Sequence, residues 1–310
     1  MIRFAGLTKR YGSIAARALG SERVLFGGDG DEGVTVTMDS IEGQGTHGRA
    51  LGVPDFQTAL GFVALVAVLF FYGGVQLQVR FGEIGLLAAE WLFLFLPALL
   101  VVRVTRSNPI RTLCLRPPSL PGLAGAIVLI AGAIPLVWTI GWLQTFVLPV
   151  PWELLQGLEE LVTAETTTRL LWLLLLLALT PAVCEEFVFR GVLLGGSRSL
   201  APWRMVVLNG VVFGAFHLSF ETVIRFLPTA SLGMVIAWAV WRTGSIWVGM
   251  LMHFVNNATI VVLVSTPSLQ GLFSDPTAPP PLWLVSIGVV AFSIGARTLA
   301  GLPIVSNEEP

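Results

Sequence analysis

Two adjacent carboxylates lie in an apolar segment of this sequence, shortly before an arginine. Glu185 and Glu186 follow Cys184, and Arg190 comes four residues after Glu186. Residues four apart share one face of a helix, so Glu186 and Arg190 are expected to pair. Glu185 points about 100° away round the helix and is left without that partner. A poorly solvated carboxylate of this kind suits a general base, with the neighbouring pair as its structural support.

Two of the chain's three histidines also lie in apolar segments. His217 follows Phe213 by four residues, and His253 precedes Asn257 by four. His253 and Asn257 should therefore project from one helix face, whereas Asn256 should point elsewhere. An ionisable group within a membrane span costs roughly 2.5–3.5 kcal/mol, so such groups are functional candidates by default.

The composition predicts a membrane protein, and we expect a multi-pass protein of the cell membrane. Of the 310 residues, 55% are hydrophobic and only 12% are charged, against roughly 25% charged in soluble domains. The formal net charge of −1 gives no indication of a basic surface that would bind nucleic acid. The two cysteines fall in unrelated segments, which excludes a disulfide framework or a thiolate metal cluster.

Apolar runs begin at about residue 56. A spanning helix needs roughly 20 apolar residues. Eight segments are candidates: 57–78, 84–103, 121–147, 168–195, 203–219, 223–241, 245–265 and 281–301. The sequence thus predicts an all-α bundle of about eight transmembrane helices over residues 56–302. Residues 1–55 are expected to be a polar, mobile cytoplasmic tail, and residues 303–310 a short C-terminal tail.

Arginine placement predicts the orientation, because positive residues favour cytoplasmic loops. Four arginines lie in the connection 103–120, which we place in the cytoplasm: Arg103, Arg106, Arg111 and Arg116. Alternation then places Arg198, Arg204, Arg242 and Arg297 inside, and Arg80, Arg169 and Arg225 outside. Eight spans put both termini in the cytoplasm.

The polar residues of three different helices lie at similar depths in this arrangement. Counted from cytoplasmic ends near 197, 203 and 243, Glu185 lies roughly 18 Å deep, His217 roughly 21 Å, His253 roughly 15 Å and Asn257 roughly 20 Å. Unrelated polar residues would have no reason to coincide. The sequence therefore predicts one site enclosed by the fourth, fifth and seventh candidate spans.

Three motifs on these helices resemble the CPBP family. They are Glu185-Glu186-x-x-x-Arg190, Phe213-x-x-x-His217 and His253-x-x-x-Asn257. That family includes type II CAAX prenyl endopeptidases and bacterial bacteriocin-processing or self-immunity proteins. The resemblance covers about residues 165–265; the first 55 residues and the first three spans lie outside its motifs.

The resemblance implies intramembrane hydrolysis of a peptide bond in a membrane protein or a lipidated, hydrophobic peptide. On the family pattern Glu185 and His217 activate water, and His253 and Asn257 form the oxyanion site. We favour a glutamate mechanism that requires no cofactor. Two histidines and a carboxylate can also bind zinc, so His217, His253 and Glu185 are the expected ligands if the enzyme depends on a metal, although no His-Glu-x-x-His is present.

Two other functions use the same buried groups. One is a transporter or proton relay, although transporters commonly contain repeats and none is evident. The other is a catalytically idle scaffold or immunity protein. The lipid bilayer is an expected partner, and an ABC-transporter complex is a candidate partner. The segment Leu7–Gly12 resembles the opening strand of ABC-transporter ATPases, but no Walker sequence follows, so no nucleotide site is implied.

Overall fold

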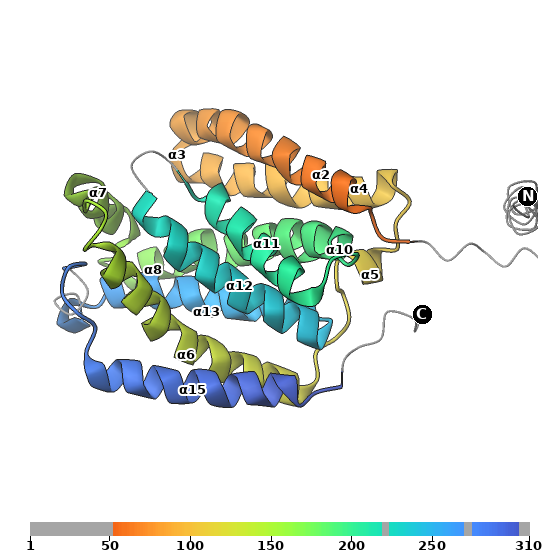
Figure 1. Cartoon of the computed structure of the whole chain (residues 1–310). Coiled ribbons are helices and arrows are strands. Elements are labelled where there is room, and N and C mark those ends of the chain that lie inside the picture. Colours follow the sequence, from red (N-terminus) through yellow and green to blue (C-terminus); the bar gives the residue numbers. More distant parts are fainter. Residues whose placement is uncertain (1–51, 219–222, 270–274, 304–310) are drawn as a thin grey trace, which may run out of the picture. The chain divides into compact units, whose positions relative to one another are not determined.

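A computed structural model describes residues 52–218, 223–269 and 275–303 of the chain. These ranges are helical and contain no strand, only an isolated bridge between Leu115 and Ser245. The all-α fold is thus confirmed, and the helices of this part lie side by side in a bundle (Figure 1). The segment Leu7–Gly12 and most of the two predicted tails lie outside the described residues.

The helices follow one another in long continuous runs. Elements η2 to η5 are π-helical stretches within those runs, and η6 is a single 3₁₀ turn. Their bounds are α2 (Phe56–Val68), η2 (Leu69–Gly74), α3 (Val75–Ala89), η3 (Glu90–Phe95), α4 (Leu96–Val104), α5 (Pro109–Thr112), α6 (Leu120–Gln144), α7 (Trp152–Val162), α8 (Thr167–Leu173), η4 (Leu174–Leu179), α9 (Thr180–Glu186), η5 (Phe187–Leu193), α10 (Leu194–Gly196), α11 (Pro202–Phe216), η6 (Val223–Arg225), α12 (Phe226–Thr243), α13 (Ile246–Val264) and α15 (Leu282–Ala300).

Six helical runs in the described ranges are long and apolar enough to cross a membrane. They are Phe56–Val104, Leu120–Gln144, Thr167–Gly196, Val223–Thr243, Ile246–Val264 and Leu282–Ala300. Helix α11, which corresponds to the predicted segment 203–219, is apolar but shorter than a full span. Large apolar side chains cover much of the outer surface, including Val79 and Trp283, as expected where lipid is the solvent.

The first run contains a sharp break at Gly82, which has φ 58° and ψ −133°. Glycine tolerates this region because it has no Cβ. The two arms pack together: a Cβ on Gly73 would lie 2.9 Å from the Phe93 ring, and η2 of the first arm contacts η3 of the second (Figure 1). The arms coincide with the predicted segments 57–78 and 84–103. The total of about eight spans and the cytoplasmic placement of both termini stay predictions.

The run Thr167–Gly196 lies at the centre of the bundle. Every residue from Cys184 to Ser197 is buried. The segment is packed between the α2–α4 hairpin, α11 and α13. A helix that is apolar on all sides is expected in such a central place. The only charged residues in that buried stretch are Glu185, Glu186 and Arg190, so their positions are set by packing from every direction.

Glycines bring α6 and α15 into close contact. A Cβ on Gly295 would collide with the backbone of Leu129, and one on Gly288 would collide with Pro135. Small residues at helix contacts let backbones approach closely in membranes, where van der Waals packing drives association. Helices α6 and α15 therefore form a closely packed layer beside α12 and α13 (Figure 1).

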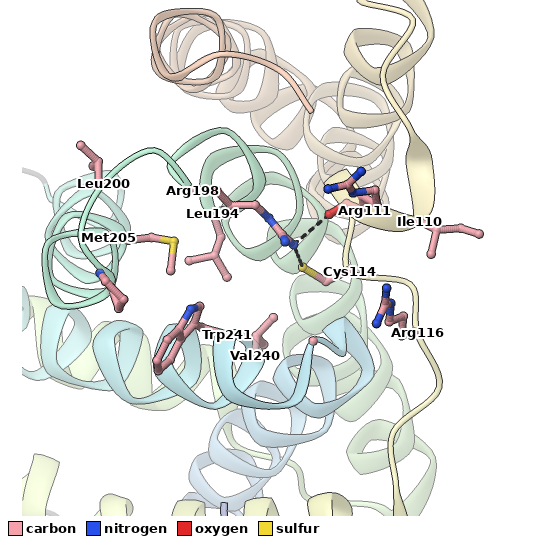
Figure 2. Close-up of a pocket in the computed structure, with 12 residues that line it drawn as sticks. Ile110, Arg111, Cys114, Arg116, Leu194, Arg198, Leu200, Met205, Val240 and Trp241 are labelled. Atoms are coloured by element: carbon pink, nitrogen blue, oxygen red, sulfur yellow. Dashed lines mark hydrogen bonds between the residues drawn. The ribbon is translucent and has the colours of Figure 1, made fainter. Parts of the chain in front are cut away.

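Helix α5 and the connection that follows it lie at the end of the bundle opposite α7 (Figure 1). Cys114 adopts a positive φ of 52°, and its carbonyl accepts a hydrogen bond of 2.8 Å from the Ile246 backbone N–H at the start of α13. Arg198 donates to the carbonyl of Arg111 at 2.9 Å and contacts the Cys114 sulfur at 3.3 Å (Figure 2). These bonds attach the α5 connection to both α10 and α13.

Candidate active site

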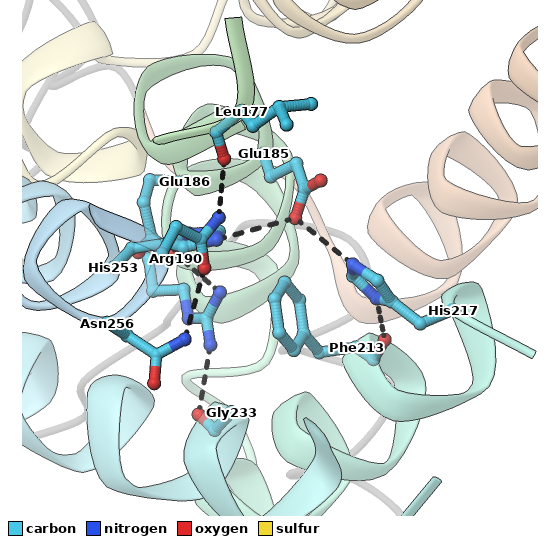
Figure 3. Close-up of polar contacts among 10 residues, drawn as sticks. Leu177, Glu185, Glu186, Arg190, Phe213, His217, Gly233, His253 and Asn256 are labelled. Atoms are coloured by element: carbon cyan, nitrogen blue, oxygen red, sulfur yellow. Dashed lines mark hydrogen bonds and ion pairs between the residues drawn. The ribbon is translucent and has the colours of Figure 1, made fainter. Parts of the chain in front are cut away.

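Three helices bring the polar motif residues together in the interior of the bundle (Figure 3). Glu185 and Glu186 form the last turn of α9. His217 is the C-cap residue of α11. His253 belongs to α13, one helical turn before Asn257. The convergence inferred from their depths is therefore present in the structure.

The expected Glu186–Arg190 ion pair is formed, and both side chains are fully buried. Arg190 Nη1 donates to Glu186 Oε1 at 2.7 Å, and Nη2 donates to the Gly233 carbonyl at 3.1 Å. The guanidinium carbon lies 4.3 Å from the centre of the Phe213 ring. Such a cation–π contact adds attraction where water is excluded. The arginine is thus fixed by contacts within its own helical run and by contacts to α11 and α12.

The same Glu186 oxygen also contacts His253. His253 Nδ1 lies 3.0 Å from Glu186 Oε1. Since an ionised carboxylate can only accept hydrogen bonds, Nδ1 is the donor. The contact fixes the ring orientation and turns Nε2 toward Glu185 (Figure 3). Glu186 therefore supports two groups, whereas its helical spacing pointed only to Arg190.

Glu185 lies between the two histidine rings. Its Oε2 atom is 3.7 Å from His217 Nε2 and 4.0 Å from His253 Nε2. The residue is only 6% exposed, and Oε2 is buried with no hydrogen-bond partner among the residues the structure describes. Leaving a buried acceptor without a hydrogen bond costs free energy. An acceptor left in this state is typical of a site that binds a ligand or takes part in a reaction.

The Phe213 carbonyl orients the His217 ring. His217 Nδ1 lies 2.9 Å from that carbonyl oxygen, which can only accept. Nδ1 therefore carries the proton, and Nε2 of the neutral ring is an acceptor facing Glu185. Separations of 3.7 and 4.0 Å are too long for direct hydrogen bonds. They suit a small molecule such as water, which can donate one hydrogen bond to Glu185 Oε2 and one to a histidine Nε2 atom.

Asn257 lies at the edge of this group and is engaged with the backbone. Its Nδ2 donates to the Leu177 carbonyl at 3.0 Å. The Asn256 amide donates to Asn257 Oδ1, also at 3.0 Å. The spacing predicted that Asn256 would point away from Asn257, and this prediction is wrong. An amide side chain is long enough to reach back over one helical step, so Asn256 lines the same cavity.

A cavity of about 450 Å³ adjoins the histidines. Its volume lies in the range of ~300–1,000 Å³ that is common for ligand pockets. Most of its wall is apolar and comes from α6, α12 and α13, while its polar residues include His217, Arg225, His253, Asn256 and Asn257. The arrangement can hold an extended apolar chain with one polar group directed at the histidines.

Two further charged residues of this region were not singled out by sequence reasoning. Glu90 on η3 is 4% exposed, interacts electrostatically with Glu185, and has one oxygen without a hydrogen-bond partner in the described part of the chain. A carboxylate within the apolar segment 84–103 was a sufficient signal. Arg225, assigned only to an outer loop, lines the cavity; its position depends on how α11 and α12 pack.

The geometry gives no separate support for a metal centre. Within the described ranges, no three histidine, cysteine, aspartate or glutamate side chains are grouped so as to hold a metal ion. Zinc ligands lie roughly 2.0–2.2 Å from the ion. His253 Nδ1 is engaged with Glu186 and His217 Nδ1 with Phe213, so only the two Nε2 atoms face Glu185.

Comparison with known families agrees with these features. Residues 167–259 match the family model described as type II CAAX prenyl endopeptidase Rce1-like. No curated protein and no solved structure matches the chain. The matched region covers less than a third of the chain but contains all seven named motif residues. The protein is thus a helical protein with six runs, in the described ranges, that are long and apolar enough to cross a membrane, and residues 167–259 form a domain similar to this family. That domain is Rce1-like, which supports its assignment to the CPBP family.

Proposed function

We propose that this protein is a glutamate-type intramembrane endopeptidase. The Rce1-like match supports a CAAX-protease-like intramembrane endopeptidase in general. One observation carries the finer proposal: a buried, unpartnered oxygen of Glu185 lies between the Nε2 atoms of two oriented histidines at a largely apolar cavity. Among residues 52–218, 223–269 and 275–303, that oxygen accepts no hydrogen bond.

Water activation is assigned to Glu185 and His217. A water at about 2.8 Å from Glu185 Oε2 could donate one hydrogen to that oxygen and the other to His217 Nε2. Glu185 removes a proton from this water while the water oxygen attacks the carbonyl carbon of the peptide bond. The tetrahedral intermediate then collapses, the C–N bond breaks, and the proton passes to the leaving amine. The products are a new carboxyl terminus and a new amino terminus.

The oxyanion role is assigned to His253 and Asn257. A donor directed at the developing oxyanion is worth roughly 3–4 kcal/mol. His253 Nδ1 already donates to Glu186, so Nε2 can donate only from the doubly protonated ring. Asn257 uses its amide nitrogen on the Leu177 carbonyl, but an amide has two N–H donors, and the second can serve substrate. No metal takes part in this scheme.

The apolar cavity wall favours a hydrophobic or lipidated peptide, or a segment of a membrane protein, as substrate. The cavity includes Thr145, Arg225 and Pro276, which belong to connections at the α7 end of the bundle. The arginine-rich connection after α4 lies at the other end (Figure 1). With both termini in the cytoplasm of a cell-membrane protein, substrate would enter from outside. An ABC-transporter complex that exports such a peptide would be a fitting partner.

A comparison of new termini tests this proposal. Membranes carrying wild-type protein, Glu185→Gln or Glu153→Gln are compared by terminus-selective proteomics. Glu153 is an exposed residue of α7 and provides a matched loss of one carboxylate. We expect a neo-terminus with wild-type and Glu153→Gln protein that is absent with Glu185→Gln.

The same experiment separates the alternative functions. An idle scaffold or immunity protein would leave the termini identical in all three membranes. A proton relay would also leave them identical, and its Glu185→Gln variant would instead lose proton flux in liposomes. Either result would overturn the endopeptidase proposal.

A further inference from the structure

The Asn257 side chain reaches a backbone carbonyl of a neighbouring helical run. That carbonyl belongs to Leu177 in η4, which packs against α13. In an α-helix the Leu177 carbonyl would accept a hydrogen bond from the backbone N–H of the residue four positions later. That residue is Pro181, which has no backbone N–H. The carbonyl therefore lacks its α-helical donor, and Asn257 Nδ2 donates to it at 3.0 Å.

Asn256 bonds to the other end of the same amide. Its Nδ2 atom donates to Asn257 Oδ1 at 3.0 Å. Because a carbonyl oxygen can only accept, the contact with Leu177 identifies the Asn257 atom on that side as the nitrogen. The Asn257 oxygen then lies on the opposite side, and the Asn256 atom that meets it must be a nitrogen. The two contacts thus assign both amides without ambiguity.

These contacts select one orientation of the Asn257 amide. With the amide turned over, its oxygen would face the Leu177 carbonyl, and two acceptors cannot form a hydrogen bond with each other. A neutral hydrogen bond favours the bonded state by roughly 3- to 10-fold after exchange with water. The bond from Asn256 therefore adds a factor of that size to the preference that Leu177 already sets.

The selected orientation determines where the remaining Asn257 donor lies. One N–H bonds to the Leu177 carbonyl, and the second N–H is the donor assigned to the oxyanion in the proposed function. A donor stabilises a developing charge best when it is already oriented before the reaction. The fraction of molecules with the amide in this orientation is therefore the fraction whose oxyanion donor is ready.

Asn256 also lines the cavity beside the histidines. Its own oxygen points away from the bond to Asn257 (Figure 3), so a direct contact with substrate is the competing role. A contact made equally with substrate and transition state raises KM and leaves kcat unchanged. A residue that acts only through an oxyanion donor lowers kcat and leaves KM unchanged. The two roles therefore differ in their kinetics.

We propose that Asn256 is a positioning residue, which holds the Asn257 amide with one N–H free for the oxyanion. The inference rests on the proposed function, since it assigns a role in the same reaction. Its basis is the chain of two hydrogen bonds from Asn256 through Asn257 to the Leu177 carbonyl.

The test uses the purified full-length protein and an internally quenched peptide that spans the bond whose cleavage yields the neo-terminus. Values of kcat, KM and the melting temperature are measured for Asn256→Leu, Asn257→Leu and the double variant. Leucine resembles asparagine in shape but has no polar atom. Thr266→Val is the matched control, because the Thr266 hydroxyl bonds to the Val262 carbonyl and the residue does not line the cavity.

We expect Asn256→Leu to lower kcat about 3- to 10-fold with KM unchanged, the share of one neutral hydrogen bond. Asn257→Leu should lower kcat about 10²–10³-fold, the value of one oxyanion donor. The double variant should be no slower than Asn257→Leu, because Asn256 acts only through that residue. Thr266→Val should match wild type. Asn256→Ala removes the same donor without adding an apolar chain, so it should give the same kcat and keeps the test valid if Asn256→Leu fails to fold.

Three outcomes overturn the positioning role. The Asn256 variants could keep the wild-type kcat, they could raise KM alone, or the double variant could be slower than Asn257→Leu by the full factor seen for Asn256→Leu. A slow Asn257→Leu beside a wild-type Asn256→Leu contradicts only this inference. A wild-type kcat in Asn257→Leu instead overturns the oxyanion assignment of the proposed function, and the positioning role with it.

Discussion

The two adjacent glutamates should respond differently to the same isosteric change. Glu186→Gln keeps the side-chain shape but removes the negative charge beside Arg190, which is fully buried and 2.7 Å away. Breaking one side of a buried ion pair costs roughly 3–5 kcal/mol, because the other charge is left uncompensated. The glutamine oxygen can still accept from Arg190 or His253, so we expect the lower half of that range.

Glu185→Gln should leave stability nearly unchanged. Its nearest ionisable neighbours are the Nε2 atoms of His217 and His253, at 3.7 and 4.0 Å, and no buried arginine depends on it for a hydrogen bond in the described ranges. Loss of a general base lowers turnover typically 10²–10⁴-fold. The fold should survive while activity is lost.

The assay measures the melting temperature of each purified variant together with its rate of peptide cleavage. A loss of about 3–4 kcal/mol lowers the melting temperature by roughly 6–16 °C for a domain of this size. Combining Glu186→Gln with Arg190→Met should recover part of that loss, since the orphan charge is gone. If Glu185→Gln is the unstable variant while Glu186→Gln melts like wild type and is merely slow, the two carboxylates have exchanged roles.

Three further predictions concern residues around this site. Gly249→Ala should lower the melting temperature, because its Cβ would lie 2.5 Å from Glu186 Oε2; Gly61→Ala, with open space around it, should not, and equal behaviour of the two would contradict the packing described. Glu90→Gln should melt at or above the wild-type temperature, since it replaces a buried carboxyl group beside Glu185 with a neutral amide; a drop of several degrees would show that the carboxyl group is needed. Arg225→Gln should raise KM for acidic peptides about fivefold, roughly 1 kcal/mol, with kcat unchanged and Arg225→Lys close to wild type; a fall in kcat alone would argue against a substrate-binding role.

Local sequence features determined the class of protein and the first contact of the site. Long apolar segments predict membrane helices because backbone hydrogen bonds must be satisfied internally in lipid. The spacing of Glu186 and Arg190 predicts their ion pair because residues four apart always meet on a helix. The three motifs carry the family resemblance, and the Rce1-like match over 167–259 agrees with it.

Only the tertiary structure decided which groups from different helices meet. Equal depth predicts that Glu185, His217 and His253 share a level, but not that His253 also bonds to Glu186, nor that Glu90 approaches from another helix. Those contacts depend on how each helix is rotated about its axis, which is set by packing against all its neighbours. The attachment of the α5 connection has the same origin: Arg198 and the Arg111 carbonyl that it contacts are 87 positions apart in the chain, and no local spacing rule connects them.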